Sequence, residues 1–262
     1  MAVWQAVVLG IVQGVTEVLP VSSSAHLVFV PKLLGLAHPP LAFDVLLHLG
    51  TLLAVAGYFA RDLVRLIREA WQGRSEARRL FLLLLIGSVP AGVFGVLAHD
   101  WIERAFAAPA ATAWQLAFTG FLVILAERRG AGGKDLDAMG PADALFIGVG
   151  QALAVVPGIS RSGATIAFGL WRGLGRTAAA RFSFLLSIPA ILGAGLVESR
   201  SLAGAAGGKL AFPYFFGFIA AAVAGTVSIA FFLRHLSRGR LRPFAVYCWA
   251  AAGAFLLYLA LS

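Results

Sequence analysis

The chain contains a series of apolar stretches, six of which are long enough, or nearly so, to cross a lipid bilayer as helices. They occupy residues 41–60, 80–98, 112–126, 182–197, 212–233 and 243–261. A spanning helix needs about 20 mostly apolar residues. Over the chain, 60% of the residues are apolar and only 13% are charged, which is about half of the charged share of a soluble domain. We therefore expect an all-α, polytopic membrane protein that forms a single integral membrane domain over residues 1–262.

Two further apolar stretches, 2–34 and 142–170, are interrupted by polar residues. The first contains Glu17, Pro20 and His26, and the second contains Pro157 and Arg161. Non-helical backbone at membrane depth is tolerated only where it is buried in protein or lines a wet cavity. Each stretch therefore predicts a re-entrant hairpin, in which two short helices joined by a polar break enter and leave on the same side.

The basic residues test this topology. If neither hairpin crosses, 16 of the 21 lysines and arginines fall on one side, while Lys32, Arg104, Arg200 and Lys209 fall on the other and Arg161 lies inside a hairpin. Basic residues accumulate on the cytoplasmic side of membrane proteins. The crowded side is thus expected to be cytoplasmic, and the net charge of +9 requires no nucleic-acid partner. The single cysteine, Cys248, excludes an intrachain disulfide and a cysteine-rich metal site.

The two hairpins indicate an internal repeat. Each begins with a glutamine, Gln13 or Gln151, and continues through an apolar half-helix, a proline and a serine cluster. Each is followed by three spans, so the halves, about 1–130 and 140–262, are expected to have inverted topology. Their polar tips would then meet near the midplane. Many transporters use this plan and bind their substrates at the broken helices.

The second break has the pattern of a helix N-terminus that binds an anion. The residues concerned are Ser160, Arg161, Ser162, Gly163 and Thr165. Ser160 can cap the helix, and the free N–H groups that follow attract negative charge. The planar guanidinium of Arg161 suits a phosphate or a carboxylate. The pattern predicts a phosphate cradle within the membrane, with a purely structural Arg161–Glu17 ion pair as the alternative.

The polar break in the first hairpin contains side chains that can transfer protons. Ser23 and His26 are three residues apart, on one face of a helix, which is the arrangement of a nucleophile and its general base. Ser23 could equally position the substrate, Ser22 or Ser23 could serve only as the helix cap, and His26 could be a buried structural histidine. Gln13 lies one turn before Glu17 and can position a water or a phosphate oxygen.

Other ionisable residues carry a weaker signal. Asp44 and His48 are one turn apart at the start of the first span, and we interpret them as a structural pair more readily than as an edge of the site. The sequence contains no metal-binding motif, so a metal is expected only as a bridge between Glu17 and a phosphate.

These residues resemble the signatures of a known family. The stretch from Gln13 to His26 reads Gln-Gly-Val-Thr-Glu-Val-Leu-Pro-Val-Ser-Ser-Ser-Ala-His, and the stretch from Pro157 to Thr165 reads Pro-Gly-Ile-Ser-Arg-Ser-Gly-Ala-Thr. Both are similar to motifs of the bacterial undecaprenyl-diphosphatases of the bacitracin-resistance type, and the resemblance covers essentially the whole chain. One departure is Gln13, at the first position of the family's carboxylate pair, which leaves Glu17 as the only strong acid of the site.

The resemblance implies a membrane phosphatase that converts undecaprenyl diphosphate to undecaprenyl phosphate, the lipid carrier of peptidoglycan precursors. It implies a multi-pass protein of the bacterial inner membrane with a site facing the periplasm, assistance by Mg²⁺ or Ca²⁺, and a homodimer. The implied catalytic residues are Glu17, Ser23, His26 and Arg161. The implied substrate-binding residues are Gln13, Ser22, Ser160, Ser162, Gly163 and Thr165.

Our hypothesis for the reaction is that Arg161 and the neighbouring N–H groups hold the phosphate while Ser23, or a water, attacks. His26 would accept or deliver the proton, and Glu17 would orient it or bind a cation. The rival interpretation is a transporter or flippase of a polyprenyl phosphate or another anion, because inverted repeats and broken helices suit alternating access equally well.

Overall fold

The computed structural model describes residues 1–36, 39–106, 108–130, 132–197, 211–237 and 239–261. These residues form helices and contain no β-strand, as expected for an all-α membrane protein. Arg200, Lys209 and Arg238, which entered the charge count above, lie outside the described residues.

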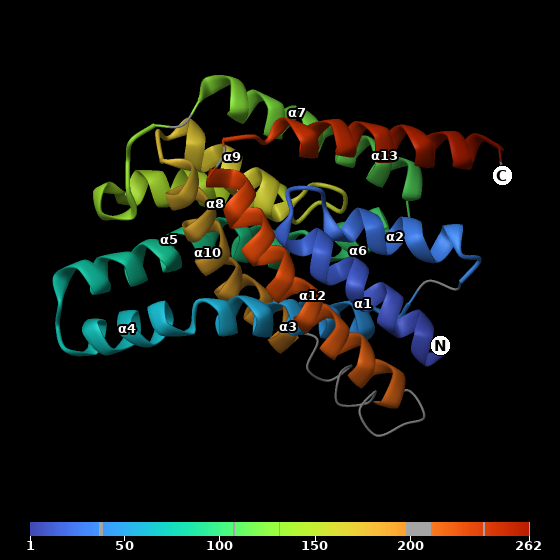
Figure 1. Ribbon diagram of the computed structural model, residues 1–262, viewed down its shortest axis with the longest axis horizontal. Coiled ribbons are helices and arrows are strands. Elements are labelled where there is room, and N and C mark those ends of the chain that lie inside the picture. The colour runs from blue at the N-terminus through green and yellow to red at the C-terminus, as the bar shows by residue number, and fades with distance from the viewer. Residues whose placement is uncertain (37–38, 107, 131, 198–210, 238, 262) are drawn as a thin grey trace.

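All six expected spans are helical (Figure 1). They are α3 (Leu41–Tyr58), α5 (Ser75–Leu97), α7 (Pro109–Arg129), α10 (Arg176–Val197), α12 (Ala211–Ser237) and α13 (Arg242–Leu261). Five of them are long and apolar enough to cross a membrane alone, and α3 reaches that length together with α4 (Ala60–Trp71), from which it is bent by 74°. The prediction of a polytopic membrane protein is confirmed.

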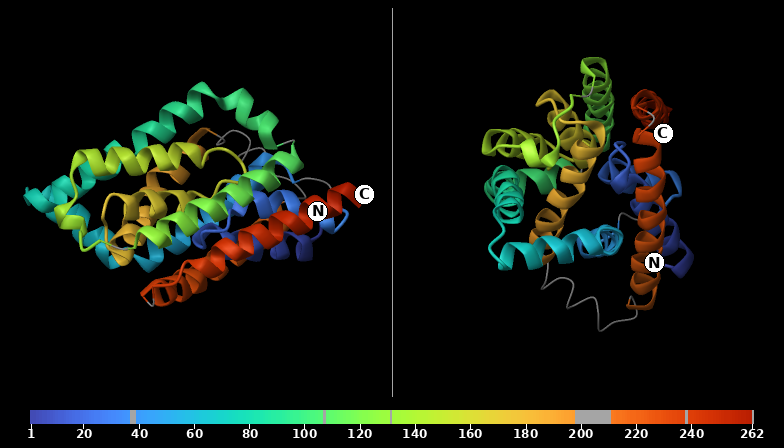
Figure 2. Two further views of the ribbon diagram at one scale, coloured as in Figure 1. Left: turned by 90° about the horizontal axis from the view of Figure 1, so that it is seen from above. Right: turned by 60° about the vertical axis from the view of Figure 1, so that its left-hand side comes forward.

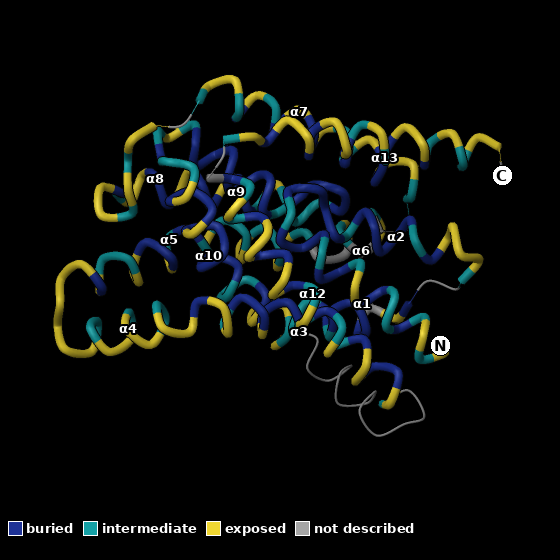
Figure 3. The backbone as a smooth tube through the Cα atoms, in the orientation of Figure 1, coloured by how far each residue is buried: buried dark blue, intermediate teal, exposed yellow. Residues whose placement is uncertain are grey.

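Both interrupted stretches form helix pairs. They are α1 (Val3–Val18) with α2 (Ser23–Leu33), and α8 (Pro141–Leu153) with α9 (Arg161–Trp171). Figure 1 shows that α2 turns back along α1. The second pair also closes on itself, because Arg172, just beyond α9, bonds to Asp143 in the first turn of α8, with 2.7 Å between Nε and Oδ1. The helix α9 is buried over most of its length and lies inside the helical bundle (Figures 2 and 3).

The helices of the two halves pack in corresponding pairs. The first hairpin helix, α1, packs along α12, and its counterpart α8 packs along α5, while α7 packs on α13 and α3 on α10. Both hairpin helices make their crossing at glycine. A Cβ added at Gly14 would lie 2.6 Å from the Ala221 carbonyl oxygen, and one at Gly148 would collide with the backbone of Gly87. Small residues let helix backbones approach closely in membranes. This correspondence supports the predicted duplication, whose boundaries remain a prediction.

The basic connections lie together at one end of the bundle. Arg79 donates to the Met139 carbonyl oxygen at 2.8 Å, and Arg181 forms an ion pair with Asp62, also at 2.8 Å. These contacts join the connections after α3, α7 and α9, which the charge count placed on the same side. The charge count treated residues 61–79 as a connection, whereas the structure folds most of this segment into α4. Two shorter helices complete the described fold: α6 (His99–Phe106) lies between α5 and α7, and η1 (Leu136–Ala138) lies in the connection after α7.

Candidate functional site

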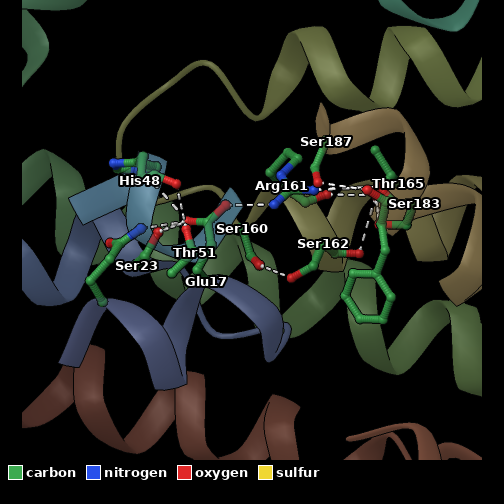
Figure 4. A network of polar contacts seen from close by, with 12 residues as sticks. Glu17, Ser23, His48, Thr51, Ser160, Arg161, Ser162, Thr165, Ser183 and Ser187 are labelled. Carbon is green, nitrogen blue, oxygen red and sulfur yellow. Dashed lines mark hydrogen bonds and ion pairs between the residues drawn. The ribbon is translucent and has the colours of Figure 1, made fainter. Parts of the chain in front are cut away.

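The tips of the two hairpins meet, as the sequence predicted. The Gly158 N–H donates to Ser24 Oγ at 3.0 Å, and the Ser162 hydroxyl donates to the Leu19 carbonyl oxygen at 3.0 Å. Each bond joins the break of one hairpin to the break of the other. The serine clusters therefore hold the two breaks together, and the charged residues of both hairpins lie in one polar network (Figure 4).

Glu17 is the centre of this network. Its Oε1 lies 2.5 Å from Arg161 Nη2. Its Oε2 accepts hydrogen bonds from the Ser23 hydroxyl at 2.5 Å and from Gln13 Nε2 at 3.1 Å, and it lies 3.5 Å from His48 Nε2. The carboxyl group is buried, with 7% of the residue exposed. A buried carboxylate is stable only when it is paired and hydrogen-bonded in this way.

Arg161 contributes both arms of its guanidinium to the site. It is the first residue of α9, and while Nη2 bonds to Glu17, Nη1 donates to the Ser183 carbonyl oxygen of α10 at 3.3 Å. The predicted Arg161–Glu17 ion pair is therefore present. It is compatible with both alternatives, because a guanidinium has five N–H donors and can serve a carboxylate and a phosphate together.

The start of α9 matches the predicted cap. Ser160 is the N-cap, and its Oγ accepts from the Gly163 N–H at 3.1 Å. Gly163 N–H is consequently not free for an anion, which corrects part of the predicted cradle. The N–H groups of Arg161 and Ser162 have no hydrogen-bond partner among the described residues. Thr165 bonds to Ser183 Oγ at 2.6 Å and so joins α9 to α10.

The start of α2 separates the roles of the two serines. Ser22 is the N-cap, with a positive φ of 65° and its Oγ accepting from the Ala25 N–H at 3.3 Å. A positive φ is unusual for a residue other than glycine and here shapes the break between α1 and α2. Ser23 follows as the first helical residue, so its hydroxyl is available to Glu17. The alternative in which Ser23 is only the cap is thereby excluded.

The expected Ser23–His26 pair is not present. The His26 ring is instead held by the Ser22 carbonyl oxygen, 2.7 Å from Nδ1, and by the Tyr247 hydroxyl of α13, 2.7 Å from Nε2. The two rings are nearly parallel, with 8° between their planes and 5.7 Å between their centroids. Because a carbonyl can only accept, Nδ1 carries the proton and Nε2 accepts from the phenol. The bond to Ser22, one turn back along α2, fixes the ring away from Ser23.

His48 lies at the edge of the site, 3.5 Å from Glu17, which was the less favoured of the two interpretations of Asp44 and His48. Its Nδ1 bonds to the Asp44 backbone oxygen at 2.7 Å, so the expected side-chain pair with Asp44 is wrong. The Asp44 carboxyl is buried, and its Oδ1 has no partner among the described residues. His48 is the group that reaches Glu17, from α3. The one-turn spacing of Asp44 and His48 was visible in the sequence, but nothing in it showed which face of α3 meets the first hairpin.

Known proteins are similar to this chain over nearly its whole length. A family model described as "Bacitracin resistance protein BacA" matches residues 6–254. The chain belongs to this family. A protein of Rubrobacter xylanophilus is 46% identical, with 95% of each chain covered, and one of Thermomicrobium roseum is 45% identical, with 94% of each covered. One of Carboxydothermus hydrogenoformans is 44% identical, over 94% of this chain and 93% of its own. Each of these relatives is named undecaprenyl-diphosphatase.

Proposed function

We propose that this chain is an integral membrane phosphatase that hydrolyses undecaprenyl diphosphate to undecaprenyl phosphate and inorganic phosphate. The observation that carries the proposal is the contact between Arg161, Glu17 and Ser23 at the meeting point of the hairpins, in a chain of the BacA family. The relatives' names support the same activity. The transporter alternative is not favoured by these names.

Arg161 binds the terminal phosphate in this proposal. Its fork and the N–H groups of Arg161 and Ser162 at the start of α9 provide the donors for the phosphate oxygens. In phosphoryl transfer most catalysis comes from positioning and from stabilising charge on the transferred group. Gln13, Ser160 and Thr165 support this cradle: Gln13 bonds to Glu17, Ser160 caps α9, and Thr165 fixes α9 against α10.

Glu17 accepts the proton of the attacking group. In one route the Ser23 oxygen bonds to the terminal phosphorus, its proton moves to Glu17, and the bond from phosphorus to the bridging oxygen of undecaprenyl phosphate breaks. A water then releases the phosphate from Ser23. In the other route a water bound near Glu17 attacks directly. The 2.5 Å bond between Ser23 and Glu17 supports Glu17, rather than His26, as the base in either route.

In this proposal His26 positions the backbone next to Ser23 and takes no part in proton transfer. It holds the Ser22 carbonyl oxygen through Nδ1, and Ser22 is the residue that directs the chain into Ser23. Tyr247 in turn holds Nε2. The pair therefore fixes the break of the first hairpin against α13.

A divalent cation fits this site only as a group shared with the substrate. The described residues hold no group of three His, Cys, Asp or Glu side chains placed for a metal. However, the buried Oε1 of Gln13 has no partner, and it lies on the residue that bonds to Glu17. Mg²⁺ is commonly held by one or two protein oxygens together with phosphates and waters. Glu17 and Gln13 would hold it, and it would supply positive charge to the diphosphate.

The setting of this activity follows from the fold and the family. The apolar helices make the chain a multi-pass membrane protein, in a membrane that contains its lipid substrate. We further propose that the arginine-rich end is cytoplasmic, that the site opens to the periplasm of a bacterial inner membrane, and that the protein can form a homodimer. The product would return to peptidoglycan synthesis, and its recycling would confer bacitracin resistance.

Phosphate release by purified protein in detergent tests the proposal. We expect release from undecaprenyl diphosphate, and a loss of at least two orders of magnitude in Glu17→Ala and Arg161→Ala. Arg128→Ala, at the exposed end of α7, is the control and should retain the wild-type rate. Detergent solution has no compartments, so a transporter without hydrolytic activity would release nothing, and that result would contradict the proposal.

A further inference from the structure

The helix α4 has an unusual composition for a membrane protein. Although it follows a spanning helix directly, it has charged residues on one side and no fully buried residue. Figure 1 shows it beside the start of α5, at the end of the bundle where the basic connections meet, and Figure 3 shows it as intermediate or exposed along its length. Its contacts with the bundle therefore account for only part of its surface.

The apolar side of α4 divides into two edges. Leu63 and Leu66 pack against the hydrophobic core. Val64, Ile67 and Trp71 do not, and they are 65%, 62% and 89% exposed. Spacings of three and four residues place these three side chains in a row along one edge of the helix. A single exposed apolar residue needs no explanation, but a row ending in an almost fully exposed tryptophan marks an interaction surface.

The charges of α4 are arranged around this row. The acidic residues Asp62 and Glu69 are paired, with Arg181 at 2.8 Å and Arg65 at 3.0 Å. Arg61 precedes Val64 by three residues and Arg68 follows it by four, so both flank the apolar edge. Both are exposed, and neither forms an ion pair within 4 Å among the described residues.

From this arrangement we propose that α4 lies in the surface of the bilayer and binds anionic phospholipid headgroups, with Val64, Ile67 and Trp71 entering the acyl boundary and Arg61 and Arg68 on the phosphates. An apolar edge flanked by arginines is the pattern of an interfacial helix. Tryptophan is enriched at the headgroup level, and clustered arginines beside a span are attracted to anionic lipids. A soluble acidic partner could bind the arginines. Whenever that partner was unbound, however, the apolar row would be exposed to water, which is unfavourable. The proposal is independent of the phosphatase activity.

Spin labels on the full chain in vesicles test the depth of the apolar edge. In a Cys248→Ala background, labels are placed by Trp71→Cys and Ile67→Cys on the apolar edge and by Arg65→Cys on the polar edge. The vesicles contain phosphatidylcholine with phosphatidylglycerol. We expect the ratio of collisions with oxygen to collisions with a water-soluble nickel chelate to be several-fold higher at positions 67 and 71 than at position 65. Equal ratios at all three positions, or labels at 67 and 71 that neither reagent reaches, would overturn the proposal in favour of a water-exposed helix or a protein contact such as a second copy.

The charge requirement is tested separately. With the label at position 71, the oxygen preference is compared between phosphatidylcholine vesicles with and without phosphatidylglycerol. The double variant Arg61→Gln, Arg68→Gln should lose the increase that the anionic lipid produces. Arg128→Gln, Arg129→Gln removes the same charge from the exposed end of α7 and should keep that increase. Equal effects of both double variants, or no effect of phosphatidylglycerol on the wild-type arginines, would contradict specific headgroup binding by α4.

Discussion

Arg161 and Glu17, which are 144 residues apart in the chain, approach to 2.5 Å at the tips of two helix hairpins. Neither partner would be stable alone at this depth, since an isolated charge in an apolar interior is strongly unfavourable. The pair therefore contributes to holding the hairpins together as well as to the chemistry proposed for them. A substitution that breaks it therefore affects both the stability of the site and its chemistry.

Arg161→Lys should be nearly as inactive as Arg161→Ala. A lysine ammonium can pair with Glu17, but it cannot also reach the Ser183 carbonyl and a phosphate as the planar fork can. We expect phosphate release to fall by about 10²–10³-fold, while the folded fraction in size-exclusion chromatography stays near wild type because the charge is retained. Wild-type turnover by Arg161→Lys would contradict the role of the fork in binding phosphate.

Ser23→Ala and Glu17→Gln should be strongly non-additive. If the two residues act as one unit, removing either removes the proton transfer, and the double variant is about as slow as the slower single variant. Phosphate release by the three variants measures this. Ser23→Ala alone also separates the two routes, because an enzyme that uses water as the nucleophile retains most of its rate without the hydroxyl. Additive losses would show that Ser23 and Glu17 work independently.

Tyr247→Phe should reduce the rate modestly without unfolding the protein. It removes the hydroxyl that holds His26 Nε2 and retains the aromatic ring beside it. A net hydrogen bond is worth about 0.5–1.5 kcal/mol, so we expect a loss of kcat of roughly 2–10-fold with little change in KM. Tyr258→Phe on the same helix, whose hydroxyl lies 3.4 Å from the Lys32 carbonyl oxygen, is the matched control. An unchanged kcat in Tyr247→Phe would show that His26 needs no support from α13.

The sequence predicted site residues where a charged residue, or a residue that ends a helix, interrupts an apolar segment. Glu17 and Arg161 stand in apolar stretches, so a shared polar site was the simplest way to place both. Ser160 precedes a run of apolar residues and could be identified as a cap from local pattern alone. The break after Pro20 was equally legible, because proline and a serine cluster end one helix and begin another. These inferences needed only local chemistry and the count of spans.

The partners from other helices could not be predicted. Which face of α3 or α13 meets the first hairpin depends on packing between segments far apart in the chain. The sequence could therefore place His48 at the edge of the site only as an alternative, and it did not connect Tyr247 with His26. Ser183 lies in an apolar span, where a serine is ordinary. The helix α4 was not predicted for a different reason, since arginines in a connection between spans fit a topology signal whether or not the connection is helical.

Gly148→Ala should destabilise the second hairpin. The added methyl group would collide with the backbone of Gly87 in α5, and neither backbone can move without disturbing the α5–α8 crossing. Overpacking of this kind costs about 1–3 kcal/mol, which should appear as a lower Tm in detergent. Gly253→Ala in α13 is the control, because nothing lies within 4 Å of the added atom. Equal Tm values for the two variants would mean that the α5–α8 contact has room for an added methyl group.

Asp143 lies at the base of that hairpin and holds its two helices together. It lies before the apolar part of α8 and accepts from Lys134 Nζ at 2.6 Å, from Arg172 Nε at 2.7 Å and from the Gly140 N–H at 2.9 Å. Burial acts to raise its pKa, but these donors outweigh burial and the pKa is lowered. A lowered pKa means that the stabilisation is present at neutral pH and is lost as the pH falls through that value.

Asp143→Asn should therefore lower Tm at pH 7 and have a smaller effect in acid, where the wild-type carboxyl is itself protonated. Thermal unfolding in detergent at a series of pH values measures the difference. Asp135→Asn is the matched control, because that exposed residue forms none of these bonds and should follow the wild-type curve. A difference between Asp143→Asn and wild type that stays constant with pH would show that side-chain shape, rather than charge, anchors α8 to α9. A difference that becomes smaller in acid would instead show that the ion pairs of Asp143 hold together the base of the hairpin whose tip carries Arg161.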